Sequence, residues 1–546
     1  MASLLPHSGR LKRRLATHLL HRCSYAYNFP QMRAMSKMEV SDAVASLFDV
    51  PAPLMTEPVS RNTGQPWINA GIDSDLGISD ERKDVVAWWV QEATYDSSLR
   101  SKMTFFLHSI FVTEYNIVNS KEFFDYLGIL RYHALGNIKE CAKKITVDNL
   151  MLKYLDGQLN SKNNPNENYA REFFELFTIG KGEQVGPGDY TNYTEEDIVT
   201  AAKLLTGFRR TSRPLGGDPD YWDTAMGVQL GKGQYSKHDT TDKTFSYAFG
   251  NATIIGAVDK EDMFRELDDF VEMVFNQIAT ARNICRKLYR FFVHSKITPE
   301  IESDIIEPLA NTLYENNYEL QPTLTQLLNS LHFYDRDDNK VKDNTVGSLV
   351  KSPLELLTHT VRFFDINLPD PITDGNNHYN KWYKQTVQNV LFTMGGLDLF
   401  MPESVAGYPA YYQEPNYSEY WFNSVSLIPR YKLPEILLKG QKVLVAGSNG
   451  GVEFDIVQYV AGNAVIKSPE KAKFLVKILC ILLFPEAPKL DRLNYFLHNI
   501  FLDDLSELNW YFEWQNYEAT GDDTNIRIPL ERLFTALLSS QEYQLM

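Results

Sequence analysis

The sequence predicts a mainly α-helical protein, a single large multi-helical domain with small β-hairpin and loop excursions. Helix start and stop signals recur throughout the chain, such as the capping box of Ser352 and Glu355 and the helix-ending Gly136. Strand-like patterns and clustered Gly and Pro are confined to irregular insertions near residues 209–258 and 402–465. The composition is 44% hydrophobic and 23% charged over 546 residues, which supplies enough apolar material for a large core.

Amphipathic helices are predicted in succession after a short N-terminal tail at residues 1–10. Apolar residues recur at three- and four-residue spacing, and the helical patterns lie near residues 11–50, 80–113, 119–155, 164–178, 194–207, 260–331, 352–364 and 468–546. Because linkers are few and this rhythm is steady, residues 11–546 are predicted to form one helical domain.

The net charge and the cysteine content of the sequence exclude several classes of protein. With 54 basic against 70 acidic residues, the net charge of -16 argues against a nucleic-acid binder, which needs a basic face. The four cysteines are far apart and form no Cys-x-x-Cys pair, so neither a zinc knuckle nor a dense disulfide framework is indicated. We expect four free, mostly buried thiols.

Export and membrane signals are weak. The first residues are basic but lack the apolar run of about 7 to 15 residues that a secretory signal contains. The expected location is therefore cytoplasmic, with a periplasmic or cell-envelope location as the alternative if a precursor is trimmed. The longest apolar run, residues 478–484, is far shorter than the ~20 residues that span a bilayer, so no transmembrane segment is expected.

Residues 154–180 gather most of the side chains suited to chemistry. Asn164 and Asn166 flank Pro165, which provides a helix cap and a first helical position at which a missing N–H costs nothing. A helix is therefore predicted from there to about Thr178, and Gly180 ends it.

One face of this helix carries Asn168, Arg171 and Glu175, with Glu172 beside them. Partly buried charges have to be paired, so one interpretation is a structural ion-pair network. The other is a catalytic or metal site, because two glutamates at i, i+3 can aim their carboxylates at one point. Residues from other segments would complete such a site. For His238 and Asp239, a role in anchoring their loop fits equally well. The candidate catalytic residues are Arg171, Glu172, Glu175, His133, His238 and Asp239.

The loop before this helix has the spacing of an EF-hand calcium site. Oxygen-bearing side chains recur at EF-hand positions, and the candidate ligands of a calcium ion are Asp156, Asn160 and Glu167. Ser161 stands where the sharp turn needs Gly, and only two carboxylates are present. The alternative is that Asp156, Asn160 and Asn166 tie the loop by side-chain to backbone hydrogen bonds.

An aromatic cluster lies between residues 402 and 430. Aromatic rings on a loop rich in Pro and Gly either stack on sugar rings or a protein partner, or anchor the loop to the core. The candidate binding residues for a glycan or a protein are Tyr411, Tyr412 and Trp421, together with Asn166 and Asn168.

Several segments match one known family in order. The most specific is NENYAREFFELFTIG at residues 166–180. The others, between residues 14 and 409, are RLATHLLHRCSYA, LRSKMTFFLHSIF, LRYHALGN, YTEEDIVTAAKLLTGF, KHDTTDKTF, IATARNICRKLYRFFV, VKSPLELL and GYP. Together they resemble the large bacterial proteins catalogued as domain of unknown function 1800. The last quarter of the chain has no segment that we match.

The resemblance implies a bacterial source and one helical domain, without an established activity. Members often carry export signals and are often encoded beside a family that resembles sulfatases, which implies an extracytoplasmic protein partner. The chain departs from the family where Trp-His-Asn-His is usual, because Leu107 and Ile110 replace the Trp and the second His. His108 is kept within an almost entirely apolar turn, which favours a hydrogen-bonded core residue over a ligand.

Two functions of different classes fit these features. The first is a binding or assembly protein of the bacterial cell envelope that works through residues 402–430 and 209–258. The second is a metal-dependent, hydrolase-like enzyme with its site around residues 166–172 and a divalent cation such as calcium as cofactor. The sequence contains no evident P-loop, G-x-G-x-x-G or H-E-x-x-H motif and no Ser-His-Asp order, so nucleotide, zinc-protease and nucleophilic chemistries lack support.

Overall fold

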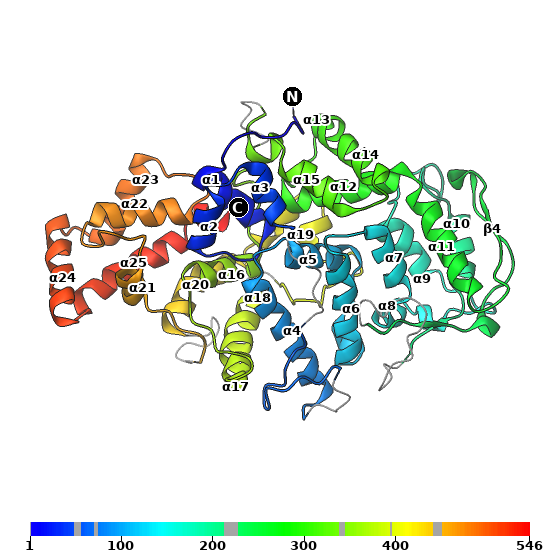
Figure 1. Ribbon diagram of the computed structural model, residues 1–546, viewed down its shortest axis with the longest axis horizontal. Helices are drawn as coiled ribbons and strands as arrows, with labels where there is room; N and C mark the ends of the chain where they lie inside the picture. The colour runs from blue at the N-terminus through cyan, green and yellow to red at the C-terminus, as the bar shows by residue number, and fades with distance from the viewer. Residues whose placement is uncertain are drawn as a thin grey trace. The chain divides into compact units, whose positions relative to one another are not determined.

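Helices form nearly all of the regular structure, as the sequence predicts (Figure 1). The computed structural model describes residues 2–48, 56–69, 75–211, 228–337, 344–393, 396–440 and 450–546. Within these ranges the strands form two short antiparallel pairs, β1 (Phe208–Arg209) with β2 (Lys232–Gly233) and β3 (Lys243–Thr244) with β4 (Thr253–Ile254). All four strands lie in the irregular region near 209–258, whereas the described part of the region near 402–465 contains helices and no strand.

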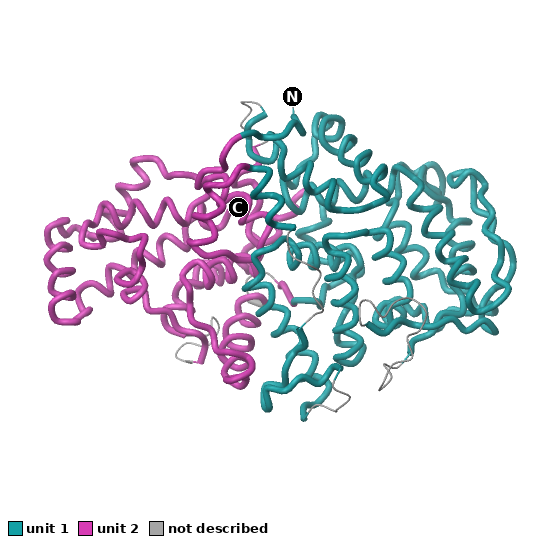
Figure 2. The backbone as a smooth tube through the Cα atoms, in the orientation of Figure 1, with its two compact units in different colours: residues 1–8, 40–338, 399–414 teal, residues 9–39, 339–398, 415–546 magenta. Residues whose placement is uncertain are grey.

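The chain forms two compact units that interleave along the sequence (Figure 2). Unit 1 contains residues 1–8, 40–338 and 399–414, and unit 2 contains residues 9–39, 339–398 and 415–546. Each unit is therefore closed by segments that are distant in sequence. Whether residues 11–546 form one domain depends on whether the two units fold and unfold together, so the single domain stays a prediction.

Unit 1 contains a helix, α5 (Arg100–Ile110), that is buried at every position except Ser109. Because neighbours cover all of its faces, α5 has no solvent-exposed side, although it carries polar residues such as Arg100 and Lys102. It packs against α6 (Ser120–His133). The other α-helices of this unit are α3 (Val40–Ser46), α4 (Ile78–Tyr95), α7 (Ile138–Thr146), α8 (Asn149–Tyr154), α9 (Asn168–Glu172), α10 (Glu195–Leu204), α11 (Asp262–Phe275), α12 (Ile278–Phe292), α13 (Pro299–Ile301), α14 (Glu307–Glu315), α15 (Leu320–Leu328) and α19 (Pro409–Tyr412).

His108 is a hydrogen-bonded core residue of α5, as its apolar surroundings indicate. Its Nδ1 lies 2.8 Å from the hydroxyl of Tyr126, and that hydroxyl donates to the carbonyl of Phe111 at 2.6 Å. Because the carbonyl takes the only hydroxyl proton, Nδ1 of His108 carries the hydrogen of the first bond. Burial lowers the pKa of His108 to about 3, so the imidazole is neutral at physiological pH.

Unit 2 contains the predicted capping box. The backbone N–H of Ser352 donates to Oε2 of Glu355 at 2.6 Å, and the N–H of Glu355 donates to Oγ of Ser352 at 3.2 Å. This box begins α16 (Pro353–Phe363). The other α-helices of the unit are α1 (Lys12–Cys23), α2 (Phe29–Met35), α17 (Gly375–Asn377), α18 (Asn389–Thr393), α20 (Leu427–Lys439), α21 (Ile456–Gly462), α22 (Ala472–Leu483), α23 (Leu490–Asn494), α24 (Glu507–Thr520), α25 (Thr524–Leu538) and α26 (Gln541–Gln544).

Two further sequence predictions concern the whole chain. The cysteines are all buried and are thiols rather than disulfides, as expected. Among the helices that the structure describes, none has the length and apolar character needed to cross a membrane.

Candidate functional site

The helix of the central segment begins later than the sequence predicts. The sequence places Pro165 in its first turn, but α9 starts at Asn168 and Pro165 stays in an exposed loop. The N–H of Asn166 donates to Oδ1 of Asn160 at 2.9 Å, and Oδ1 of Asn166 accepts from the N–H of Asn168 at 2.9 Å. These side-chain bonds hold the loop in a turn and so delay the start of the helix.

The geometry of this helix changes after Glu172. Residues Phe173–Phe177 form a π-helix, and Gly180 ends the element in the left-handed conformation at φ 73°. A π-helical turn is wider than an α-helical one and recurs at functional sites. Arg171 and Glu175 therefore lie on the two sides of a change in helix type.

Arg171 lies in an ion-pair network. This is the first of the two interpretations offered above for the polar face of the helix. Its guanidinium is 3.2 Å from Oε2 of Glu167 and 4.0 Å from Oε1 of Glu175, and it binds both carboxylate oxygens of Glu195 on α10. Lys181 pairs with the other oxygen of Glu175 at 2.9 Å. The hydrogen bond from Arg171 lowers the pKa of Glu195. Glu195 on α10 completes the network, and the sequence alone does not identify it as a partner of Arg171.

Glu172 differs from these neighbours. Within the described ranges its carboxylate makes no hydrogen bond and no ion pair. It is half-buried, and burial, reinforced by the charge of Glu175, raises its pKa. A carboxyl group with a raised pKa beside a second carboxylate resembles the general acids of many enzymes. Glu172 is therefore the predicted catalytic residue with the clearest chemical argument.

His238 belongs to a buried charge cluster. Its Nδ1 lies 2.7 Å from the carbonyl oxygen of Thr206, and its Nε2 lies 2.7 Å from Oε2 of Glu266 on α11. Lys243 on β3 is 2.5 Å from the other oxygen of Glu266 and donates to the carbonyl of Asp239. The side chains of His238, Lys243 and Glu266 are almost fully excluded from solvent. This cluster anchors the loop that contains His238 and Asp239, the role that the sequence analysis gives as the alternative to catalysis.

The remaining predicted catalytic residue, His133, is buried at the C-terminal end of α6 with its ring 5.0 Å from that of Tyr132. The structure thus joins Arg171 to Glu175, and it places His238 next to Asp239 in the buried cluster. Across the parts of the chain that the structure describes, no group of three or more His, Cys, Asp or Glu side chains could hold a metal ion.

Two of the three residues predicted to bind calcium, Asn160 and Glu167, are engaged in bonds within the protein. Asn160 is buried, donates its amide to a carbonyl of α10 at 2.9 Å and accepts from Asn166. Glu167 pairs with Arg171, and Asp156 is left-handed (φ 57°) at the start of a 3-10 turn. The bonds of Asn160 and Asn166 are the predicted side-chain to backbone ties of the loop, whereas the side chain of Asp156 makes no such bond to the described residues. The amide oxygen of Asn160 already has a donor.

The aromatic region packs mostly onto the core. The ring of Tyr411 lies 5.3 Å from that of Phe291 and 5.9 Å from that of Phe105. Trp421 is buried, whereas Tyr412 is 42% exposed. Of the three predicted aromatic binding residues, Tyr411 and Trp421 pack against the core and Tyr412 alone is exposed, and their role in binding stays a prediction. The predicted polar partner Asn168 is exposed at the start of α9.

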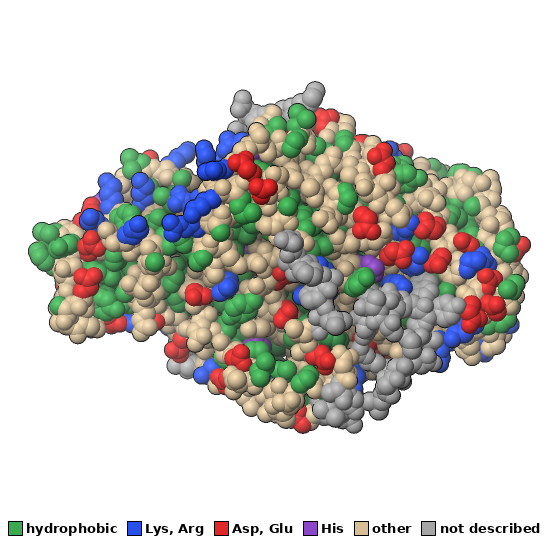
Figure 3. Space-filling model, in the orientation of Figure 1, with side chains coloured by type: hydrophobic (Ala, Val, Ile, Leu, Met, Phe, Trp, Pro, Cys, Tyr) green, Lys and Arg blue, Asp and Glu red, His purple; other side chains and the backbone are tan. Residues whose placement is uncertain are grey.

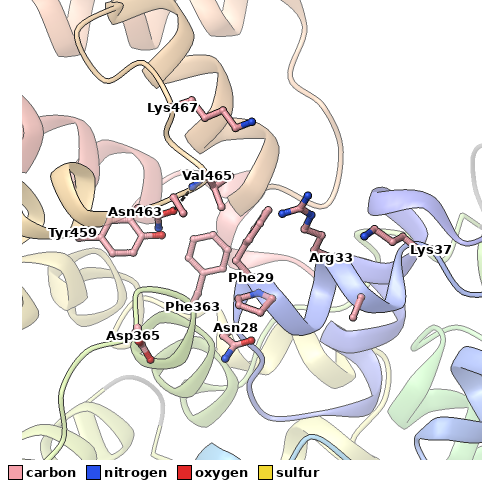
Figure 4. Close-up of a pocket in the computed structure, with 13 residues that line it drawn as sticks. Asn28, Phe29, Arg33, Lys37, Phe363, Asp365, Tyr459, Asn463, Val465 and Lys467 are labelled. Carbon is pink, nitrogen blue, oxygen red and sulfur yellow. Dashed lines mark hydrogen bonds between the residues drawn. The ribbon is translucent and has the colours of Figure 1, made fainter.

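A cavity in unit 2 gathers charged, polar and aromatic side chains from three segments (Figure 4). Its volume is about 690 Å³, which is in the range of small-molecule sites. One wall is α2 with the preceding Asn28, and a second is the end of α16 at Phe363 with the following Asp365. The third wall runs from Tyr459 on α21 to Lys467.

Three exposed cations, Arg33, Lys37 and Lys467, line this cavity (Figure 4). None of them has an acidic partner among the residues that the structure describes. Asp365 also lines the cavity, but it pairs with Arg362 at 3.0 Å and so does not neutralise the three cations. Uncompensated positive charge on a concave surface attracts anions.

The cavity also has aromatic and amide groups. Figure 4 shows the rings of Phe29 and Phe363 close together between the charged residues. Burial, followed by the charge of Asp365, raises the pKa of Tyr459, so its hydroxyl stays protonated. Oδ1 of Asn463 accepts from the N–H of Val465 at 2.9 Å and fixes the turn after α21. The site therefore combines a positive rim with apolar ring surfaces.

A buried cluster of His21, Tyr27 and His359 lies close in sequence to the first two walls of the cavity. The rings of His21 and His359 stack at 4.8 Å, and Nε2 of His21 lies 2.8 Å from the hydroxyl of Tyr27. His359 lies one helical turn before Phe363 on α16, and Tyr27 directly precedes Asn28. Hydrogen bonds and stacking thus fix the two segments that supply the first two walls of the cavity.

A family model described as "Protein of unknown function (DUF1800)" matches residues 18–545. The chain belongs to the DUF1800 family. This match includes the last quarter of the chain, in which our sequence analysis finds no matching segment. No curated protein and no solved structure matches this DUF1800 chain. Two segments that carry the DUF1800 resemblance, RLATHLLHRCSYA and VKSPLELL, lead into α2 and α16 and therefore into two walls of the cavity.

Sequence reasoning did not find this cavity. Its walls come from three segments far apart in the DUF1800 sequence, and α21 lies within the last quarter, where no motif is evident. The one local signal is a pair of cations four residues apart, Arg33 in α2 and Lys37 in the turn that follows it.

Proposed function

We propose that this DUF1800 protein is a binding protein of the bacterial cell envelope whose ligand occupies the cavity of unit 2. The observation that carries the proposal is a set of three cations, Arg33, Lys37 and Lys467, around a concave site with aromatic walls. None of the three pairs with an acidic side chain among the described residues. The ligand class that fits is a small molecule in which an anionic group is attached to a ring. The cations bind the anion, and Phe29 and Phe363 take the ring.

The composition of the cavity favours binding over catalysis. Its described lining residues include no His, Cys, Ser or Glu, the side chains that most often act as nucleophile or general base. The one carboxylate, Asp365, is held by Arg362. The lining therefore supplies charge and surface for recognition. The envelope location is supported by the export signals that members of the DUF1800 family often carry.

Three matched probes test the proposal by calorimetry. Phenyl phosphate carries both an anion and a ring, inorganic phosphate carries only the anion, and phenol carries only the ring. Phenyl phosphate is expected to bind more tightly than either of the other two. Arg33→Gln with Lys467→Gln should weaken this binding by about tenfold or more, because hydrogen bonds to charged groups contribute about 1.5–3 kcal/mol each.

Lys432→Gln is the matched control, since Lys432 is an exposed lysine of α20 that does not line the cavity. This variant should bind phenyl phosphate like the wild type. Equal binding by the double variant, or equal heats for phosphate and phenyl phosphate, would refute the assignment of the cavity to an anionic ring ligand.

A second candidate, the metal-dependent hydrolase-like enzyme, rests on Glu172. Its half-buried carboxyl group, which has no ion-pair partner among the described residues, has a raised pKa and lies beside Glu175 where the helix widens into a π-helix. The test is equilibrium dialysis with manganese and with calcium. Glu172→Gln should remove metal uptake if this candidate is correct, whereas Glu195→Gln, an ion-paired neighbour, should not.

A further inference from the structure

Charge is distributed unevenly between the two units. Of the 54 Lys and Arg and 70 Asp and Glu in the chain, 25 and 23 fall in unit 2, which leaves 29 and 47 in unit 1. Unit 2 is therefore close to neutral, whereas unit 1 carries the acidic excess. The net negative charge of the whole protein conceals this difference.

Several cations of unit 2 gather on one face. Figure 3 shows Lys and Arg concentrated over the region in which Figure 1 draws α1, α2, α22 and α23. The first turn of α1 exposes three consecutive cations at residues 12–14. The segment of α22 and its flanks exposes Lys471, Lys473, Lys477 and Lys489. We call this surface the basic face.

Most of these cations are not neutralised. Arg14 pairs with Glu486 at 2.5 Å, which joins the start of α1 to the loop after α22. By contrast, Lys471, Lys473 and Lys477 have no acidic partner in the described ranges. Like charges on one surface repel one another, so an unneutralised row of lysines is stabilised when an anionic partner covers it.

Two exposed apolar side chains stand directly beside these lysines. Phe474 follows Lys473 and is 37% exposed, and Leu490 follows Lys489 and is 66% exposed. Phe474 points outward although α22 has a fully apolar inner face at Leu475 and Leu479. A polyanion in water would use the lysines but gain little from these two apolar groups. A lipid surface uses both, because lysines reach the anionic headgroups while apolar side chains enter the boundary with the acyl chains.

We propose that the basic face of unit 2 docks on the surface of an anionic lipid bilayer. Lys471, Lys473 and Lys477 contact the headgroups, and Phe474 and Leu490 insert at the interface. The protein then lies on the membrane without spanning it. Residues outside the cavity carry this proposal, so it stands or falls independently of the cavity ligand.

Vesicle co-sedimentation of the full chain tests the proposal. Vesicles of phosphatidylcholine with phosphatidylserine should bind the protein, vesicles of phosphatidylcholine alone should not, and added salt should release it because it screens charge. Lys473→Gln with Lys477→Gln should weaken binding roughly twenty-fivefold, since each lysine near an anionic surface contributes about a fivefold factor. Phe474→Ser should weaken it about three- to tenfold.

The matched control is Lys381→Gln with Lys384→Gln, which removes two exposed lysines from another helix of unit 2. This control should bind vesicles like the wild type, and circular dichroism should show that all variants are folded. The proposal is overturned if the two vesicle types bind equally, or if the control loses as much affinity as the α22 variant. It is also overturned if Phe474→Ser binds normally, an outcome that would indicate a polyanion as the partner.

Discussion

Lys351 is the most unusual buried cation of unit 2. Its side chain is fully buried, its Nζ lies 4.2 Å from the centre of the Tyr543 ring, and it makes no hydrogen bond to any residue that the structure describes. Burial, reinforced by the charge of Arg430, lowers the pKa of Lys351 to about 7, although Glu355 acts in the opposite direction. The amine is therefore largely neutral in the folded protein at slightly alkaline pH.

This pKa predicts how stability depends on pH. Between pH 7 and about 10.5 the unfolded chain protonates Lys351 and the folded chain does not, so this group makes the free energy of unfolding rise with pH. Lys351→Met removes that contribution and should also stabilise the protein near pH 7, where burying the charge costs most. Urea unfolding at pH 7, 8, 9 and 10 measures the difference between variant and wild type.

Lys432→Met, at an exposed position on α20, is the control for that series. Its difference from the wild type should stay constant across the same pH range. A Lys351→Met curve parallel to the wild-type curve would mean that the folded protein keeps this lysine charged.

At the scale of elements, the cluster of His238, Lys243 and Glu266 joins a loop, β3 and α11. Glu266 lies against both His238 and Lys243 and is itself fully buried. Removing one member of a buried charge cluster leaves its partners unpaired, which costs about 3–5 kcal/mol. The cluster therefore fixes the irregular region near 209–258 to the helices.

Glu266→Gln is predicted to lower the free energy of unfolding by about 3–5 kcal/mol. Glu195→Gln makes the same change in the partly exposed network around Arg171, where a loss of at most about 1 kcal/mol is expected. Urea denaturation at pH 7 measures both values. Similar losses for the two variants would show that burial does not separate these clusters energetically.

The loop before α9 gives a second prediction at this scale. Asn160→Ala removes an acceptor for Asn166 and a donor to α10, so it should destabilise the protein by about 1–3 kcal/mol. The loss should be the same in calcium and in chelator, because the bonds are internal to the protein. Thermal melting in both buffers measures it, and Asn163→Ala, an exposed change in the same loop, is the control. A melting temperature that rises with calcium only in the wild type would restore the calcium site.

At the scale of the whole molecule, the chain passes several times from one unit to the other. The chain enters unit 2 three times, and residues 399–414 return to unit 1 between two of these visits. A unit assembled from distant segments closes only after all of them are in place. The interleaved chain therefore favours unfolding of the two units together.

Hydrogen exchange measured by mass spectrometry at increasing urea tests this expectation. Peptides from α5 in unit 1 and from α25 in unit 2 are predicted to lose protection at the same urea concentration, as in a single cooperative transition. Two separate midpoints would instead show that each unit is an independent domain.

The sequence by itself determined the helical class, the capping box of Ser352 and Glu355, the core role of His108 and the family. These features depend on patterns within a few turns of one segment, where the spacing of side chains follows from helix geometry alone.

Only the tertiary structure decided which side chains meet. Glu195 became the partner of Arg171, Glu266 became the partner of His238, and a cavity formed from α2, α16 and α21 that no motif indicates. The start of α9 also moved, because bonds from Asn160 and Asn166 outweighed the local preference for Pro165. Pairing of this kind joins residues that are far apart in the chain, and its energy comes from burial and charge, which the order of amino acids does not express locally.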